Sequence, residues 1–171
     1  MVPALYGDCD VPMMNSPVPG SDELTYLTLN NLRGSAMKLV VDFLKKSQTQ
    51  YLATIGTDGK PKVRPFQFKL EDGGKLYFST TNDKQVYKEI TQQPYVELCA
   101  CGENFSWLRL SGKVVFSQDR SIKSRIIEEA IPLVRAIYKT PDNPIFALFY
   151  LDEAIATIAD FSGNPPQTFR L

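Results

Sequence analysis

The sequence predicts a mainly β fold, an α+β protein built on a small antiparallel β-barrel of six or seven strands with flanking helices. Three observations lead to this prediction. Short β-rich segments follow one another with turn residues between them, few segments show helical spacing, and 43% of the 171 residues are apolar. That apolar share is enough to bury the core of one domain.

Residues 1–36 differ from the rest of the chain because several prolines, from Pro3 to Pro19, break any periodicity. We expect this part to be an irregular leader or fused segment without a catalytic role. The main domain is therefore placed at residues 37–171.

The first half of that domain begins with apolar residues at helical spacing between 39 and 44, followed by Lys45 and Lys46. This pattern predicts a short amphipathic helix. β-Rich segments then predict strands at 51–55, 62–70 and 75–80, separated by turn sequences that contain Asp and Gly. Connections of this length suit an antiparallel meander.

In the second half, Asn82 is followed three residues later by Gln85, which predicts a capping box that opens a helix over residues 83–91. Further strands are predicted at 95–101 and 105–116, and Gly112 in the second is a candidate bulge or barrel bend. A helix over 121–138 follows. Strands at 145–151 and 154–161 close the barrel, and residues 160–166 read as a loop.

Composition narrows the function. Nineteen basic and nineteen acidic residues balance, which gives no support to a nucleic-acid footprint or a membrane-surface role and favours a small partner. No signal or membrane span is visible. Three cysteines, Cys9, Cys99 and Cys101, favour a reducing cytoplasmic setting and buried structural thiols, with no metal site. The chain has no histidine, which excludes the usual nucleophile–histidine catalysis and histidine-based metal sites, so a cofactor should carry any redox chemistry.

A candidate anion site lies where the strand at 75–80 passes into a helix. Ser79, Thr80 and Thr81 provide hydroxyl groups, the helix provides free N–H groups, and Lys84 provides a positive charge. The alternative is that the polar side chains only cap the helix while Lys84 faces solvent.

Two more cations, Arg64 and Lys69, stand five residues apart on a predicted strand. On a regular strand they face opposite sides, so either one points outward or the strand twists or bulges between them. Each is otherwise a solvated edge charge.

These segments together resemble the pyridoxamine 5′-phosphate oxidase-like family of FMN-binding split barrels, over residues 37 to 161. The motifs that carry the resemblance are, in order, Asp58-Gly59-Lys60-Pro61, the Arg64-to-Lys69 strand, Ser79 to Thr81 with Lys84, Gln93-Pro94-Tyr95-Val96, and Trp107-Leu108-Arg109-Leu110-Ser111-Gly112. The C-terminal Trp and Arg segment that binds pyridoxal phosphate in those oxidases has no convincing match here, so oxidation of vitamin B6 is not implied.

The resemblance implies a split barrel that binds FMN and serves as an oxidoreductase, with a small-molecule electron donor and acceptor. It further implies a homodimer with cofactor sites at the interface. The implied cofactor residues are Arg64, Pro65, Phe66, Gln67 and Lys69 along the flavin, Ser79, Thr80, Thr81 and Lys84 at its phosphate, and Trp107 and Arg109 reaching the neighbouring subunit's flavin.

Other functions stay open at this stage. The same pocket suits a flavin-binding carrier or sensor without turnover, and other split barrels use the deazaflavin F420 or haem. A β-barrel binding module without a cofactor is the remaining alternative. No catalytic residue is predicted: Tyr51, Tyr77 and the cysteines are candidates for proton transfer, and none is preferred.

Overall fold

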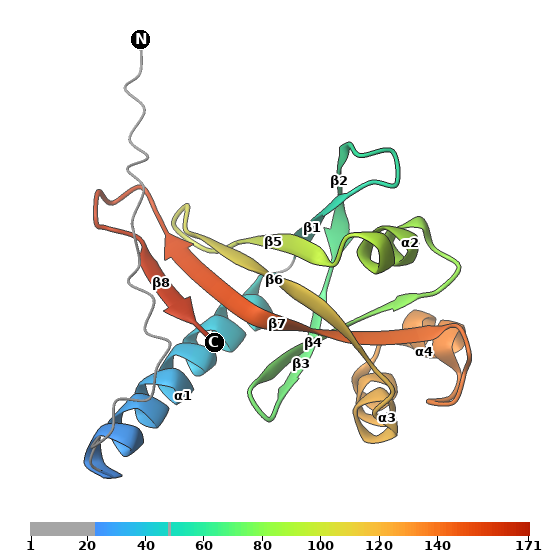
Figure 1. Ribbon diagram of the computed structural model, residues 1–171, viewed down its shortest axis with the longest axis horizontal. Helices are drawn as coiled ribbons and strands as arrows, with labels where there is room; N and C mark the ends of the chain where they lie inside the picture. The colour runs from blue at the N-terminus through green and yellow to red at the C-terminus, as the bar shows by residue number, and fades with distance from the viewer. Residues whose placement is uncertain (1–22, 48) are drawn as a thin grey trace.

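A computed structural model describes residues 23–47 and 49–171, which form one open antiparallel sheet of eight strands with four helices (Figure 1). The strands are β1 (Gln50–Ile55), β2 (Pro61–Phe66), β3 (Phe68–Asp72), β4 (Lys75–Thr81), β5 (Tyr95–Cys101), β6 (Trp107–Ser117), β7 (Phe146–Ala159) and β8 (Gln167–Arg170). The helices are α1 (Glu23–Lys46), α2 (Gln85–Gln92), α3 (Arg120–Glu129) and α4 (Pro132–Tyr138). The predicted antiparallel split barrel is confirmed.

The order of the strands explains why the barrel is split. The hydrogen-bonded path runs β2-β1-β5-β6-β7-β4-β3, and β8 pairs with β7. β2 and β3 stand at opposite ends of this path, yet only Gln67 separates them in sequence. Because one residue spans less than about 4 Å, the sheet has to curl until its two edges meet at Gln67. The single strand predicted at 62–70 is therefore wrong, and the meander does not continue from β2 to β3.

The side chain of Gln50 links the end of α1 to the start of β3 at this split. Its buried side chain donates from Nε2 to the carbonyl of Leu44 (2.8 Å), near the end of α1, and its Oε1 accepts the N–H of Phe68 (2.7 Å), at the start of β3. These bonds supply partners to two backbone groups that lie inside the protein. The split thus keeps its buried polar groups satisfied.

The core has two parts. The larger one lies between the concave side of the sheet and helices α1 and α2, and Phe78 and Phe149 stack at its centre with ring centroids 5.7 Å apart. The smaller one lies where α3 and α4 cover β4 and β7, and it includes Tyr138. Figure 1 shows α3 and α4 together at one end of β7 and α1 toward the other. The strand β4 is buried on both sides because it contributes to both parts.

The predicted capping box is wrong. Helix α2 begins at Gln85, its N-cap is Lys84, and no side chain bonds to the cap. Asn82 donates its side-chain N–H to the carbonyl of Pro144 instead (2.9 Å). Asn82 therefore links the end of β4 to the segment just before β7. A local sequence pattern does not reveal this contact, because the two residues lie far apart in sequence.

Other element boundaries also differ. The helix predicted over 121–138 is two helices because Pro132, which lacks an N–H, starts α4. The two closing strands are one long strand, β7, in which Glu153 has a φ of 51°. The bulge expected at Gly112 is confirmed by a register shift between Ser111 and Lys113. Strand β8 was not predicted.

At the N-terminus, α1 begins at Glu23, so the expectation of irregular structure is wrong for residues 23–36. Residues 1–22, with Cys9 among them, lie outside the described part of the chain. The domain boundary at residue 37 stays a prediction. None of the described helices is long and apolar enough to cross a membrane.

Candidate functional site

A cleft of about 530 Å³ opens at the split of the barrel. It brings together eight of the residues predicted to contact a cofactor, which come from β2, β3, β4 and the start of α2: Arg64, Pro65, Phe66, Gln67, Lys69, Ser79, Thr80 and Lys84. The remaining lining residues are Thr49, Val86, Val134, Ile137 and Tyr138. Segments more than eighty residues apart in sequence thus meet at one place.

The polar side of the cleft is cationic. Lys69 and Lys84 both line it, beside the hydroxyl residues Ser79 and Thr80 at the end of β4. Burial lowers the pKa of Lys69, and the positive charge of Lys84 lowers that pKa further. Two ammonium groups that repel each other across a cleft with hydroxyl donors are suited to bind an anion between them.

The N-terminus of α2 adds to this polarity. Lys84 is the N-cap and Val86 lies in the first turn, and both line the cleft. The first N–H groups and the positive end of the helix dipole therefore lie at the cleft, where they favour negative charge.

Arg64 belongs to a partly buried ion pair at the cleft wall. Its Nη2 donates to Oε2 of Glu89 (2.7 Å) and its Nη1 donates to Oγ1 of Thr54 (2.6 Å). The Thr54 hydroxyl donates in turn to the same Glu89 oxygen (2.6 Å). Glu89 is only 1% exposed at its side chain, whereas Arg64 is 24% exposed.

The structure also settles how Arg64 and Lys69 relate. Both cations line the same cleft, and the register of β3 on β4 shifts between Phe68 and Leu70, at Lys69 itself. Of the alternatives that the spacing left open, a bulge-type irregularity between the two residues is the one observed.

The cleft also has an apolar lining. Phe66 packs against Phe78 and Phe149, with ring centroids 6.3 and 6.0 Å away, and Val134 and Ile137 of α4 also line the cleft. The cleft therefore suits an amphipathic ligand that has both an anionic group and a flat apolar part.

Tyr138 is a polar residue of the cleft that the sequence did not single out, as is Thr49. Its hydroxyl donates to Oγ of Ser79 (3.1 Å), and its ring stacks on Phe146 with centroids 3.9 Å apart. Burial raises the pKa of this phenol, so it stays a neutral donor. A tyrosine at the end of a helical pattern is too weak a signal to be identified before the fold is known.

Three predicted cofactor residues lie elsewhere. Thr81 is buried at the end of β4, where its carbonyl accepts the N–H of Lys84 (3.2 Å). Trp107 and Arg109 point away from the core: Trp107 packs on Phe161 with ring centroids 5.1 Å apart, and Arg109 pairs with Glu97. Their expected contact with a neighbouring subunit's flavin stays a prediction.

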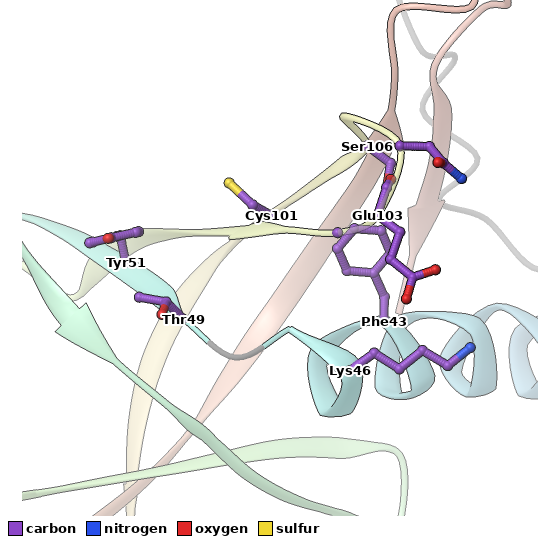
Figure 2. A pocket seen from close by; sticks show the side chains of 9 residues that line it. Phe43, Lys46, Thr49, Tyr51, Cys101, Glu103 and Ser106 are labelled. Carbon is purple, nitrogen blue, oxygen red and sulfur yellow. The ribbon is translucent and has the colours of Figure 1, made fainter.

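A second, larger cleft of about 680 Å³ lies near the end of α1 and shares only Thr49 with the first. Figure 2 shows Lys46 and Glu103 at one end of it and Tyr51 and Cys101 toward the other. None of the predicted cofactor residues lines it. Its charged lining residues are Lys46 and Glu103, so it offers no cluster of cations for an anionic ligand.

The remaining candidates for proton transfer lie away from the cleft at the split. Tyr77 is buried in the smaller core, and burial raises its pKa. Cys101 is exposed and Cys99 is partly buried with a raised pKa, so neither is the fully buried thiol that we expected. The described residues contain no cluster of three or more potential metal ligands.

Comparisons with known proteins identify the family and the fold of this chain. A family model described as pyridoxamine 5′-phosphate oxidase matches residues 36–151. The crystal structure of a NimC/NimA family protein from Clostridium acetobutylicum is 35% identical, with a TM-score of 0.74, and the match covers 84% of this chain and 99% of that one. Among curated proteins, none matches.

Two more distant structures share the fold. A pyridoxamine 5′-phosphate oxidase-related, FMN-binding protein from Nostoc punctiforme is 20% identical, with a TM-score of 0.59 and coverage of 78% of this chain and 86% of that one. A haem-binding protein from Mycobacterium smegmatis is 12% identical, with a TM-score of 0.61 and coverage of 79% and 57%. The same barrel thus occurs in proteins with different ligands.

Proposed function

Because this chain belongs to the pyridoxamine 5′-phosphate oxidase family, we propose that it binds FMN in the cleft at the split and is an FMN-dependent oxidoreductase acting on small molecules. The observation that carries the proposal is that Lys69, Lys84, Ser79 and Thr80 all line that cleft, where the charge of Lys84 lowers the pKa of Lys69. A phosphate group needs cations and hydroxyl donors that converge in this way.

The cleft fits FMN in size and in chemistry. Its volume falls in the range of about 300–1,000 Å³ that is usual for small-molecule sites. The cationic side suits a phosphate, which carries a charge of about −1.5 to −2 at neutral pH. The wall formed by Phe66, Val134 and Ile137 suits a flat ring system.

Residues of the chain would have separate tasks in this site. Lys84 and the hydroxyls of Ser79 and Thr80 would hold the phosphate, and Tyr138 would orient the Ser79 hydroxyl. The sequence grouped Lys69 with Arg64 beside the ring, but the effect of Lys84 on the Lys69 pKa supports a place for Lys69 at the phosphate end. When bound, FMN would accept a hydride from a donor and pass electrons to an acceptor.

We also propose that the protein is a homodimer with a site at each side of the interface and that it acts in the cytoplasm. The outward-facing Trp107 and Arg109 on β6 support the first point. The unpaired thiols of Cys99 and Cys101 support the second, because a reducing compartment keeps thiols in that state.

The first experiment is an absorption spectrum of purified protein incubated with FMN and freed of excess ligand. We expect a two-banded flavin spectrum at about one FMN per chain, since the described part of the chain has one cleft with this cationic lining. A haem or F420 spectrum from the protein as isolated would replace FMN in the proposal. Repeated reduction by a nicotinamide donor and reoxidation by a quinone or nitro compound would separate an enzyme from a carrier or sensor.

Replacing Lys84 with Ala tests the phosphate end. We expect K84A to weaken FMN binding roughly 10- to 100-fold, because it removes a charge-assisted contact. The unfolding midpoint should not change, since Lys84 is exposed. Fluorescence titration with FMN measures the first quantity and urea unfolding the second.

Lys88 provides the matched control, because it is an exposed lysine one turn further along α2 that does not line the cleft. K88A should bind FMN as the wild type does. Equal FMN affinity in K84A and the wild type would contradict the proposed phosphate site.

A further inference from the structure

The Arg64–Glu89 ion pair at the cleft wall has no part in the proposed binding of the phosphate. Glu89 comes from α2, Thr54 from β1 and Arg64 from β2, so three elements place their polar groups at one point. The carboxylate of Glu89 is almost fully buried and accepts from both of its neighbours. Such an arrangement holds the Arg64 side chain in one orientation.

The pair also changes the charge balance of the cleft. A guanidinium stays protonated at any ordinary pH, so three cations line the cleft: Arg64, Lys69 and Lys84. Glu89 lies 2.7 Å from Arg64 and offsets its charge. The uncompensated charge near the cleft is then that of the two lysines, which matches a phosphate dianion.

We propose that Glu89, together with Thr54, is a positioning residue that holds Arg64 as a charge-compensated hydrogen-bond donor to the uncharged ring end of the ligand, and leaves the anionic end to Lys69 and Lys84. This inference rests on the proposed FMN site and goes further, because it assigns the two ends of the cleft to different residues. Arg64 uses one N–H of each terminal nitrogen in these contacts, and its fork carries five in all. Its remaining N–H groups are available to carbonyl acceptors of the ligand.

The test compares FMN with riboflavin, which has the same ring system and no phosphate. E89Q keeps the shape of the side chain and an acceptor oxygen but removes the compensating charge. We expect it to weaken riboflavin binding on the order of tenfold, because a hydrogen bond from a positioned charged group is lost. The ratio of FMN affinity to riboflavin affinity should rise in E89Q, because Arg64 then attracts the phosphate.

K84A is the comparison variant, because it should lower the same ratio by weakening FMN alone. Fluorescence quenching by each flavin gives the affinities, and the absorption maximum of the bound flavin reports directly on contacts at the ring. Equal weakening of both flavins in E89Q, which a general structural defect would produce, would leave the ratio unchanged and would contradict the assignment.

Thr54 offers a second route in case E89Q does not fold. T54V removes the acceptor for Nη1 of Arg64 while preserving the volume, and T54S restores the hydroxyl. We expect T54V to weaken riboflavin binding several-fold and T54S to recover it.

Riboflavin affinity within twofold of the wild type in both E89Q and T54V would overturn the assignment, and so would a fall in the FMN to riboflavin ratio in E89Q. Failure of the wild type to bind any flavin would instead overturn the proposed function, and the assignment with it. The two failures are therefore distinguishable.

Discussion

The ammonium of Lys69 is an ionisable group of the cleft through which pH should affect both stability and ligand binding. Burial lowers its pKa below the ordinary value of 10.5, and the charge of Lys84 adds to the effect. Without a ligand, the folded protein loses this proton at a lower pH than the unfolded chain does. The unfolded state then binds more protons, so the contribution of Lys69 to stability rises with pH between the lowered pKa and 10.5.

Without a ligand, the cleft favours the neutral form of Lys69. A bound phosphate favours the charged ammonium instead. We therefore predict that FMN affinity falls as the pH rises through the lowered pKa of Lys69. In K69R the fall should begin at a higher pH, since a guanidinium keeps its charge. Fluorescence titrations from about pH 7 to about pH 10 measure this. Parallel declines in the wild type and K69R would show that another group controls the effect.

At the residue scale, the sequence predicted one side of the cleft well. Arg64 to Lys69 and Ser79 to Lys84 flank a hairpin, so their closeness follows from local connections. Tyr138, Val134 and Ile137 approach from α4, which lies far along the chain from both segments, and only tertiary packing brings them there. Glu89 was missed for a related reason: a glutamate within a short helix looks like a solvated charge until the helix is packed on β1 and β4.

At the scale of elements, the junction between β2 and β3 decides the shape of the molecule. Its cause could not be read from the sequence, because Phe66 and Phe68 keep the alternation of one continuous strand across Gln67. The structure shows that a buried polar side chain, Gln50, supports the break by bonding to the N–H of Phe68. A single glutamine two residues before an apolar strand position carries no visible signal of such a role.

Replacing Gln50 with Leu tests this support. We predict that Q50L lowers the free energy of unfolding by about 1–3 kcal/mol for each buried backbone group that loses its partner. The two groups are the N–H of Phe68 and the carbonyl of Leu44. Urea unfolding measures the loss. Q92L, at an exposed position at the end of α2, controls for the chemistry of the substitution and should leave stability nearly unchanged.

A stability of Q50L equal to that of Q92L would mean that water or a shifted backbone satisfies both groups, and that Gln50 does not support the split. The FMN affinity of Q50L tests in addition whether β3 has moved. Because β3 carries Lys69 into the cleft, a displaced β3 should also weaken binding.

At the scale of the whole molecule, the convex side of the sheet bears an unusual number of exposed apolar side chains. Along β1, β2, β5 and β7 these are Tyr51, Ile55, Val63, Tyr95 and Ile155, with exposed fractions from 37 to 69%. The strand registers place them on the same side as Trp107 and Arg109. Apolar side chains that gather on one face, here around the Arg109–Glu97 ion pair, are typical of an interaction site and support the proposed homodimer.

Trp107 is the residue that tests the dimer together with the flavin site. It lies on this convex side, packed on Phe161, while its neighbour Leu108 is fully buried in the core. We predict that W107A weakens self-association and FMN retention together, because the ring would be lost from an interface that contains the cofactor site. Analytical ultracentrifugation over a range of protein concentrations measures the first effect, and the FMN content after gel filtration the second.

The control is L32A, which removes an apolar side chain of similar exposure to those of the convex side from α1 and should alter neither quantity. Loss of unfolding free energy in W107A with association and FMN content unchanged would make Trp107 a packing residue of the single chain. A weaker dimer that retains its FMN would separate the two roles and place the cofactor site within one subunit. Only the joint loss supports an interface that completes the cleft, because a ring that contacts the partner's ligand cannot be removed without affecting both.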